Sequence, residues 1–155
     1  MTETAILLKT LGDPVDLTAL QPLYHNTDGP SFDFLKGLLV QAHCRAWCLV
    51  RSEKAVAAIW YQCAAERAEM VDLRVLTTER RQGFGRQLLW ASLTALEGVR
   101  SVDLEVRSSN LPARALYESL GFCEAGTRPD YYATANGRED AVLMSLGLGY
   151  SDSST

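Results

Sequence analysis

The strongest constraint on how this chain folds is an abrupt change in the spacing of its apolar residues near position 80. Between Val71 and Val75, apolar side chains alternate with Asp72 and Arg74, which predicts a strand with one buried face. From Phe84 to Leu96 the apolar residues instead recur at helical spacing, which predicts a helix. The segment between these runs must therefore connect a strand to a helix.

This connecting segment has the composition of a phosphate-binding loop. Its residues are Arg80, Arg81, Gln82, Gly83, Phe84, Gly85 and Arg86. A helix N-terminus presents unpaired backbone N–H groups and a positive dipole end, and glycines let a phosphate approach the backbone closely. Arginine adds donors that match phosphate geometry. We therefore predict a phosphate site at the start of this helix.

The loop lacks the defining residues of two common nucleotide-binding motifs. A dinucleotide fingerprint needs a third glycine where this chain has Leu88, and a P-loop needs Gly-Lys followed by Ser or Thr. A glycine-rich turn before a core helix, with solvated arginines, is a simpler explanation of the same residues. The loop alone therefore leaves the kind of phosphate ligand open.

The periodicity of the whole chain predicts one mixed domain. A strand at 6–10 and a helix at 32–43 precede strand-like runs at 46–51, 55–62 and 69–75. After the helix from Phe84 come a strand at 102–106, a helix from Asn110, and two strands at 122–127 and 141–146 with a turn at Asn136-Gly137 between them. We expect an α/β (mixed α+β) fold over residues 1–150, with a mostly antiparallel sheet flanked by helices, and a disordered tail at 151–155.

Composition and charge argue against several classes of protein. A net charge of −4 lacks the basic footprint of nucleic-acid-binding proteins. The chain contains no apolar run of membrane-spanning length, and its first residues do not resemble a signal peptide. The four cysteines form no CxxC pair and only two histidines exist, so we predict no metal site. We expect a cytoplasmic protein with free, buried thiols and no nucleic-acid or membrane partner; the sequence does not indicate its oligomeric state.

The second half of the chain carries more specific motifs. The loop resembles the Q/R-x-x-G-x-G/A signature of the GNAT N-acetyltransferase superfamily, in which backbone amides hold the pyrophosphate of acetyl-CoA. Four further stretches resemble the RimI-type branch: Leu104–Asn110, Ala115–Phe122, Tyr131–Thr134 and Gly137–Ala141. Enzymes of that branch acetylate the N-terminal alanine of a small-subunit ribosomal protein. The resemblance covers about residues 71–146 and implies a GNAT-like domain, acetyl-CoA as co-substrate and a protein N-terminus as partner.

The same resemblance assigns roles to individual residues. It makes Glu105 the general base and Tyr117 the acid that protonates the CoA thiolate. It adds three residues to the cofactor-binding set, namely Leu73, Val75 and Asn110. Each also has a simpler structural explanation: Glu105 as a solvated strand carboxylate, Tyr117 as a packed aromatic residue, and Asn110 as a helix N-cap.

The acceptor amine is less constrained than the acetyl donor. Tyr131 and Tyr132 lie near the acceptor by resemblance, and Asp72 faces away from Leu73, where it could meet a cationic acceptor. Arg74 stands where the family often has a small residue, so this strand departs from the pattern beside the substrate. A protein α-amine, with a pKa near 7.7–8.0, loses its proton more readily than a lysine near 10.4. A carboxylate base therefore favours an N-terminal acceptor.

Two alternative functions remain open at this point. The first is a GNAT enzyme that acetylates a small-molecule amine or a lysine. The second is a module that binds CoA without catalysis. The presence of both Glu105 and Tyr117 argues against the second alternative.

Overall fold

The computed structural model describes residues 6–12, 14–25 and 29–149. The chain forms two compact units, each made of two separate segments. The first unit contains residues up to Ala64 together with Met70–Glu97, and the second contains Ala65–Glu69 together with the residues from Gly98 onward. The strands follow the hydrogen-bonded order β1-β2-β3-β4-β5-β7-β6. One strand, β4 (Arg67–Val75), contributes residues to both units.

The first unit contains most of the helices. Its strands are β1 (Ile6–Thr10), β2 (Cys44–Arg51), β3 (Lys54–Ala64) and the later part of β4. Its helices are α1 (Pro14–Leu20), α2 (Phe32–Leu39) and α3 (Phe84–Ala95), with the short 3-10 helices η1 (Gln21–Tyr24) and η2 (Thr77–Glu79). Strands β1, β2 and β3 pair antiparallel in sequence order.

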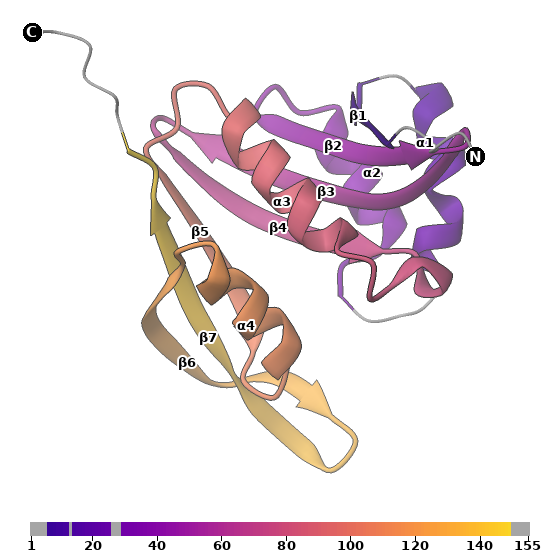
Figure 1. Cartoon of the computed structure of the whole chain (residues 1–155). Helices are drawn as coiled ribbons and strands as arrows, with labels where there is room; N and C mark the ends of the chain where they lie inside the picture. The colour runs from indigo at the N-terminus through magenta and orange to yellow at the C-terminus, as the bar shows by residue number, and fades with distance from the viewer. Residues whose placement is uncertain (1–5, 13, 26–28, 150–155) are drawn as a thin grey trace, which may run out of the picture. The chain divides into compact units, whose positions relative to one another are not determined.

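Helices cover both faces of β3, as the contacts of two neighbouring residues show. The indole Nε1 of Trp60 donates a hydrogen bond to the hydroxyl of Tyr24 in η1 at 2.8 Å. The Tyr61 hydroxyl instead lies 2.7 Å from that of Ser92 in α3. Because successive strand residues point to opposite faces, α3 lies on one face and η1 on the other (Figure 1). This two-sided burial explains why β3 is apolar almost without interruption.

The second unit is built around β5 (Ser101–Arg107). The start of β4 pairs with β5 in parallel, and β5 pairs antiparallel with β7 (Gly137–Gly147), which pairs antiparallel with β6 (Cys123–Thr134). Val102, Leu104 and Val106 are buried on one face of β5. Helix α4 (Leu111–Ser119) covers this apolar face (Figure 1).

The end of α4 approaches that face closely. Gly121 follows the helix with a φ of +102°, a backbone conformation that favours glycine. A Cβ placed on it would lie 3.1 Å from the Leu146 side chain, and Leu146 is the register partner of Val102. The alternation along β5 therefore turns Asp103 and Glu105 to the opposite face.

The predicted fold class is confirmed: the sheet is mixed, mostly antiparallel and flanked by helices. The start of α3 at Phe84 and the turn before Gly137 also agree with the sequence. The four thiols are free, but only Cys48 and Cys63 are buried; Cys44 is half-buried and Cys123 is exposed, so the prediction of buried thiols was wrong for these two. The largest errors in the predicted boundaries were in three elements. Helix α2 ends at Leu39 instead of residue 43, β6 continues to Thr134 instead of residue 127, and β7 begins at Gly137 instead of residue 141.

Other predictions about the whole chain can be compared only with the described residues. The domain boundary at residue 150 stays a prediction, and the predicted disordered tail at 151–155 lies outside the described residues. Across residues 6–12, 14–25 and 29–149, no helix is long and apolar enough to cross a membrane. In the same part of the chain, no group of three His, Cys, Asp or Glu side chains is arranged to hold a metal ion.

Candidate active site

The predicted phosphate loop lies in the first unit, where η2 leads into α3. Gly83 is the N-cap of α3, with φ 80° and ψ 11°. A Cβ at Gly83 would meet no atom within 4 Å, so the left-handed backbone rather than crowding favours glycine here. No side chain caps this helix, and its first turn contains no acidic residue. The N–H groups of the first turn are therefore not used by a side-chain cap, and the positive end of the helix dipole is not neutralised locally.

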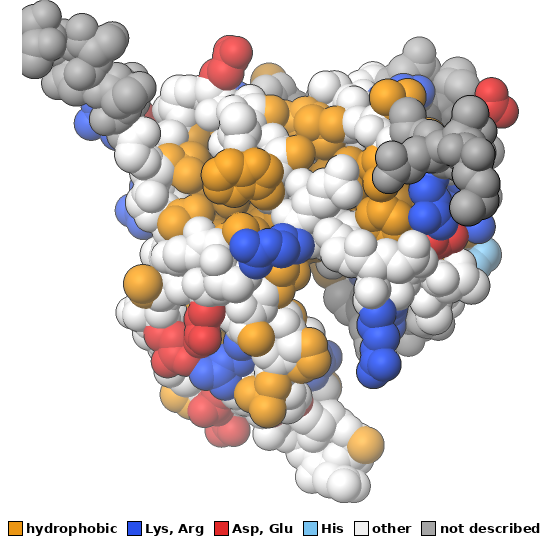
Figure 2. All heavy atoms as spheres, in the orientation of Figure 1, with side chains coloured by type: hydrophobic (Ala, Val, Ile, Leu, Met, Phe, Trp, Pro, Cys, Tyr) orange, Lys and Arg blue, Asp and Glu red, His pale blue; other side chains and the backbone are white. Residues whose placement is uncertain are grey.

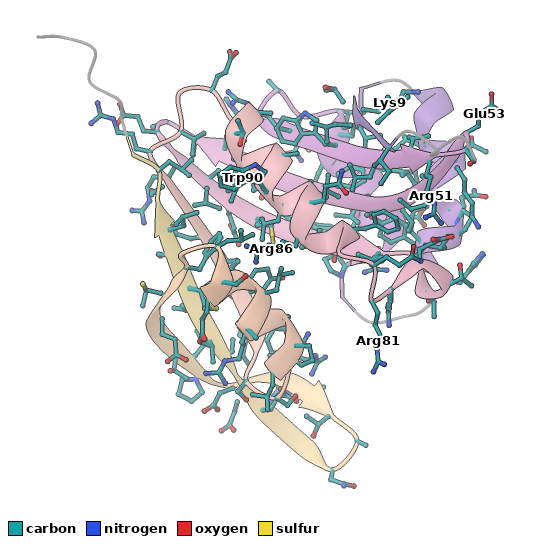
Figure 3. The ribbon with its side chains drawn as sticks, viewed as in Figure 1. Lys9, Arg51, Glu53, Arg81, Arg86 and Trp90 are labelled. Atoms are coloured by element: carbon teal, nitrogen blue, oxygen red, sulfur yellow. The ribbon has the colours of Figure 1, made fainter. Side chains whose placement is uncertain are left out.

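Arginine side chains surround this helix start. Arg80, Arg81 and Arg86 are all exposed. Arg81 has a left-handed φ of 66° and projects away from the ribbon, whereas Arg86 extends from the face of α3 that also carries Trp90 (Figure 3). Hydrophobic atoms are also visible on the surface over α3 (Figure 2). The loop thus combines an uncapped helix N-terminus with nearby cations, as an anion site requires.

The side chain of Gln82 has a structural task within the loop. Its Nε2 donates to Glu79 Oε2 at 3.0 Å, and its Oε1 accepts from Arg51 Nη1 at 3.2 Å. Arg51 also forms an ion pair with Glu79 and lies 5.1 Å from the centroid of the Phe84 ring. This network ties the end of β2 to the loop, so the backbone of Gln82 is the part that we expect to meet a phosphate.

Asp72 and Arg74 form a buried pair on the part of β4 that belongs to the first unit. Arg74 Nη2 lies 3.4 Å from Asp72 Oδ1, and their side chains are 11% and 10% exposed respectively. The guanidinium also lies 4.3 Å from the centroid of the Tyr24 ring. The other Asp72 oxygen is buried without a hydrogen-bond partner. Burial raises the pKa of Asp72 to about 6, against the opposing effects of the Arg74 charge and hydrogen bond. The predicted acceptor-facing carboxylate thus has an internal cationic partner.

Replacing Asp72 with asparagine should change how folding stability depends on pH. The folded-state pKa is raised, so wild-type stability is fully present below pH 4 and is lost as pH rises through about 6. The loss amounts to about 3 kcal/mol, from a pKa difference of about two. We expect urea unfolding to give equal stability near pH 4 and a more stable Asp72→Asn variant above pH 7. A stability difference that does not change with pH would contradict this assignment.

Glu105 is held by an arginine in the second unit. Arg128 Nε lies 2.9 Å from Glu105 Oε1, with side chains 56% and 20% exposed respectively. Both residues line a cavity of about 360 Å³, together with Arg67, Glu69 and Asp103. Glu105 is therefore a partly buried carboxylate at a hollow in the sheet surface, and it already has a cationic partner.

The predicted tyrosine pair lies close to this carboxylate. The rings of Tyr131 and Tyr132 meet edge to face with centroids 4.9 Å apart, and the Arg128 guanidinium lies 5.7 Å from the Tyr131 ring centroid. Arg107 lies 4.6 Å from the centroid of Tyr132. Burial, and then the negative charge of Glu105, raise the pKa of the Tyr132 hydroxyl. The structure thus places Glu105 near both tyrosines: Arg128 contacts Glu105 and the Tyr131 ring, and the charge of Glu105 acts on Tyr132.

Tyr117 and Asn110 both belong to the α4 region. Tyr117 is only 7% exposed, and its ring lies edge-on to that of Phe122 with centroids 5.8 Å apart. Asn110 caps α4 by accepting from the Ala113 N–H at 3.2 Å. Because α4 covers the apolar face of β5, Tyr117 and Glu105 lie on opposite faces of the same sheet. The capping role of Asn110 is confirmed, and its amide N–H₂ group is a separate donor.

Leu73 and Val75 complete the predicted cofactor-binding set, and both are half-buried residues of β4 in the first unit. Sequence reasoning missed Arg128, which contacts the predicted base, and also Arg107 and Glu139, which lie beside Tyr132 and pair with each other. Arg107 could have been found, because it lies two residues after Glu105 on the same strand face. Arg128 gave no such signal, because its position depends on how β6 pairs across β7.

Three comparisons place this geometry among known proteins. The profile of the acetyltransferase (GNAT) family matches residues 15–122. The [ribosomal protein bS18]-alanine N-acetyltransferase of Escherichia coli K12 is 45% identical over 102 residues, which are 64% of this chain and 69% of that protein. The crystal structure of the ribosomal-protein-S18-alanine N-acetyltransferase from Escherichia coli matches with a TM-score of 0.88 at 32% identity, covering 97% of this chain and 99% of that one.

A more distant structure shares the fold. Arabidopsis thaliana NAA60 in complex with acetyl-CoA matches with a TM-score of 0.79, over 93% of this chain and 99% of that chain. At 16% identity this likeness concerns the arrangement of helices and strands alone.

Proposed function

Since the chain belongs to the GNAT acetyltransferase family and is an acetyl-CoA-dependent N-acetyltransferase, we propose that its acceptor is the N-terminal α-amine of a protein, of the ribosomal-protein alanine type. The observation that carries this proposal is the match to the Escherichia coli ribosomal-protein-S18-alanine N-acetyltransferase over nearly the whole of both chains. The lower pKa of an α-amine compared with lysine also suits a carboxylate base.

The proposed donor site uses the residues of the first unit. Acetyl-CoA supplies an acetyl thioester and a pyrophosphate. The uncapped first turn of α3 and Arg80, Arg81 and Arg86 fit the charge of that pyrophosphate. Backbone groups of Leu73 and Val75 bind the pantetheine arm and the acetyl carbonyl in this proposal, and the amide of Asn110 is a further donor assigned to the CoA.

The proposed proton transfers use the residues of the second unit. Glu105 accepts a proton from the acceptor ammonium, directly or through water, and leaves an amine that can attack the acetyl carbon. Tyr117 donates its hydroxyl proton to the thiolate as the C–S bond breaks and the C–N bond forms. The new amide nitrogen releases its extra proton to water, from which Tyr117 is protonated again. The Tyr131–Tyr132 pair beside Glu105 supports a place for the acceptor chain there, and Asp72 with Arg74 is assigned to the acceptor side of β4.

A competition among acceptor classes tests the proposed function. Purified full-length chain is incubated with acetyl-CoA, a peptide that begins with alanine, an N-terminally blocked peptide that contains lysine, and spermidine. We expect mass spectrometry to find the acetyl group on the α-amine of the first peptide, because its proton is the easiest to remove near neutral pH. Acetylation of the lysine peptide or spermidine, with none on the α-amine, would reject the proposed acceptor.

A further inference from the structure

The contact between Glu105 and Arg128 presents a chemical problem for a general base. Arg128 Nε lies 2.9 Å from Glu105 Oε1, so this oxygen is not open to an acceptor ammonium while the contact lasts. The guanidinium stays charged in proteins, so the pair is not dissolved by proton loss from the arginine. If Glu105 removes a proton from the acceptor, Arg128 must first give up this contact.

The backbone around Arg128 suits a movable side chain. The pairing of β6 with β7 shifts register between Arg128 and Tyr132, so the regular ladder is interrupted after Arg128. The interruption is itself fixed by other groups. Asp130 has a left-handed φ of 52°, and its N–H donates to Asp140 Oδ1 at 2.9 Å. Arg138 Nε donates to the Asp130 carbonyl at 2.7 Å. The backbone is thus held while the Arg128 side chain remains more than half exposed.

The charges around the cavity indicate what kind of group can replace Arg128. Its charged lining residues comprise the three carboxylates of Glu69, Asp103 and Glu105 and the two arginines Arg67 and Arg128, an excess of one negative charge. Asp103 is already engaged, because it pairs with Arg67 at 3.0 Å and accepts from Ser145. Arg107 lies against the Tyr132 ring and pairs with Glu139, and it does not line this cavity. The cavity therefore favours a positively charged ligand, and an ammonium group is compact enough to reach Glu105 there.

We propose that Arg128 is a displaceable cap on Glu105, which the ammonium group of the acceptor replaces when it binds. This inference rests on the proposed role of Glu105 as the base. The guanidinium occupies one carboxylate oxygen of Glu105 until an acceptor arrives. After the exchange, the ammonium transfers one proton to Glu105, and the resulting amine lone pair forms the C–N bond as the C–S bond breaks. The leaving thiolate takes a proton from Tyr117, and the new amide nitrogen releases its extra proton to water. Unlike the guanidinium, the ammonium can give up its proton, so only the exchanged pair is productive.

The exchange has a modest cost, which sets the size of the expected effect. A partly exposed ion pair of this kind contributes about 0.4–1 kcal/mol, which corresponds to about two- to fivefold in an equilibrium constant. An acceptor that must break this pair binds more weakly by the same factor. Removing the cap should therefore improve acceptor binding, whereas removing an arginine that contacts the acceptor would weaken it.

The test compares Arg128→Met with two control variants. Arg67→Met makes the same change in charge in the same cavity and removes the partner of Asp103 instead. Arg128→Lys keeps the charge. With the alanine-starting peptide as acceptor, we expect Arg128→Met to lower KM about two- to fivefold with kcat within about twofold of wild type. We expect Arg67→Met to lower KM by a smaller factor, and Arg128→Lys to stay close to wild type.

A second measurement ties the effect to Glu105. Calorimetry gives the Kd of the same peptide, in the presence of CoA, for Arg128→Met with and without Glu105→Gln. We expect the gain in affinity only when Glu105 is present, because a neutral amide does not hold the guanidinium in the same way. A KM that is unchanged or raised in Arg128→Met, or an equal gain in Arg67→Met, would overturn the cap. If Glu105→Gln itself keeps full turnover, the assignment of Glu105 as the base is wrong. This result is distinct from those that reject the role of Arg128.

Discussion

The Glu105→Gln variant is expected to lose about 10²- to 10⁴-fold in kcat while its affinity for acetyl-CoA stays within about twofold. The substitution keeps the size and hydrogen-bonding capacity of the side chain but removes its ability to accept the ammonium proton. Arg128 loses its charged partner at the same time, and that pair is partly exposed, so the effect on folding should be small. Steady-state turnover with the alanine-starting peptide and calorimetry with acetyl-CoA measure the two quantities separately.

A neighbouring carboxylate gives a matched control for this experiment. Asp103 lies two residues earlier on the same strand face, lines the same cavity and pairs with Arg67 as Glu105 pairs with Arg128. Asp103→Asn therefore repeats the change in charge without touching the proposed base, and we expect a much smaller loss of kcat. Comparable losses in both variants would show that the negative charge of the cavity, and not proton transfer by Glu105, supports the reaction.

The Gly85→Asp variant is expected to bind acetyl-CoA at least about 100-fold more weakly than wild type. A carboxylate about 4 Å from a phosphate repels it by about 4 kcal/mol at the effective dielectric constant of a protein surface. The new side chain would also compete with the phosphate for the N–H groups of the first turn of α3. The fold should survive, because an acidic residue in the first turn of a helix is stabilised by the helix dipole.

The control for this loop variant is Gln87→Asp on the same helix. Gln87 is exposed. Its backbone N–H already donates to the Gly83 carbonyl at 3.0 Å, so it is not one of the N–H groups proposed to bind the phosphate. We expect this variant to keep acetyl-CoA affinity within about threefold, since a charge beyond the first turn is partly screened by solvent. If calorimetry finds unchanged affinity in Gly85→Asp, with a normal thermal transition, the assignment of the loop to the pyrophosphate is wrong.

The sequence predicted the elements whose signals are local. The start of α3 followed from the change of period and from Gly83, whose left-handed backbone needs no partner elsewhere in the chain. Alternation along β5 likewise separated buried Leu104 from Glu105 on the other face. Such features depend on residues close in sequence, so a single chain is enough to find them.

The features that escaped prediction depend on pairing between distant segments. Arg128 meets Glu105 only because β7 lies between β5 and β6 and because β6 shifts register after Arg128. The pairing of Asp72 with Arg74 could have been predicted, since the two residues share a strand face. The burial that raises the pKa of Asp72 could not, because it comes from surrounding elements. The sequence therefore identified the candidate base and not the cation that holds it.

The division of β4 between two units has a consequence for the order in which the chain can fold during synthesis. Every residue of the first unit has been made once Glu97 is complete. Arg67–Glu69 must wait, because their partners Ser101–Asp103 are made later. The ribosome thus delivers a first unit that can pack early, with a short strand segment of the second already in place. When β5 leaves the ribosome, its parallel partner Arg67–Glu69 is already joined to the first unit.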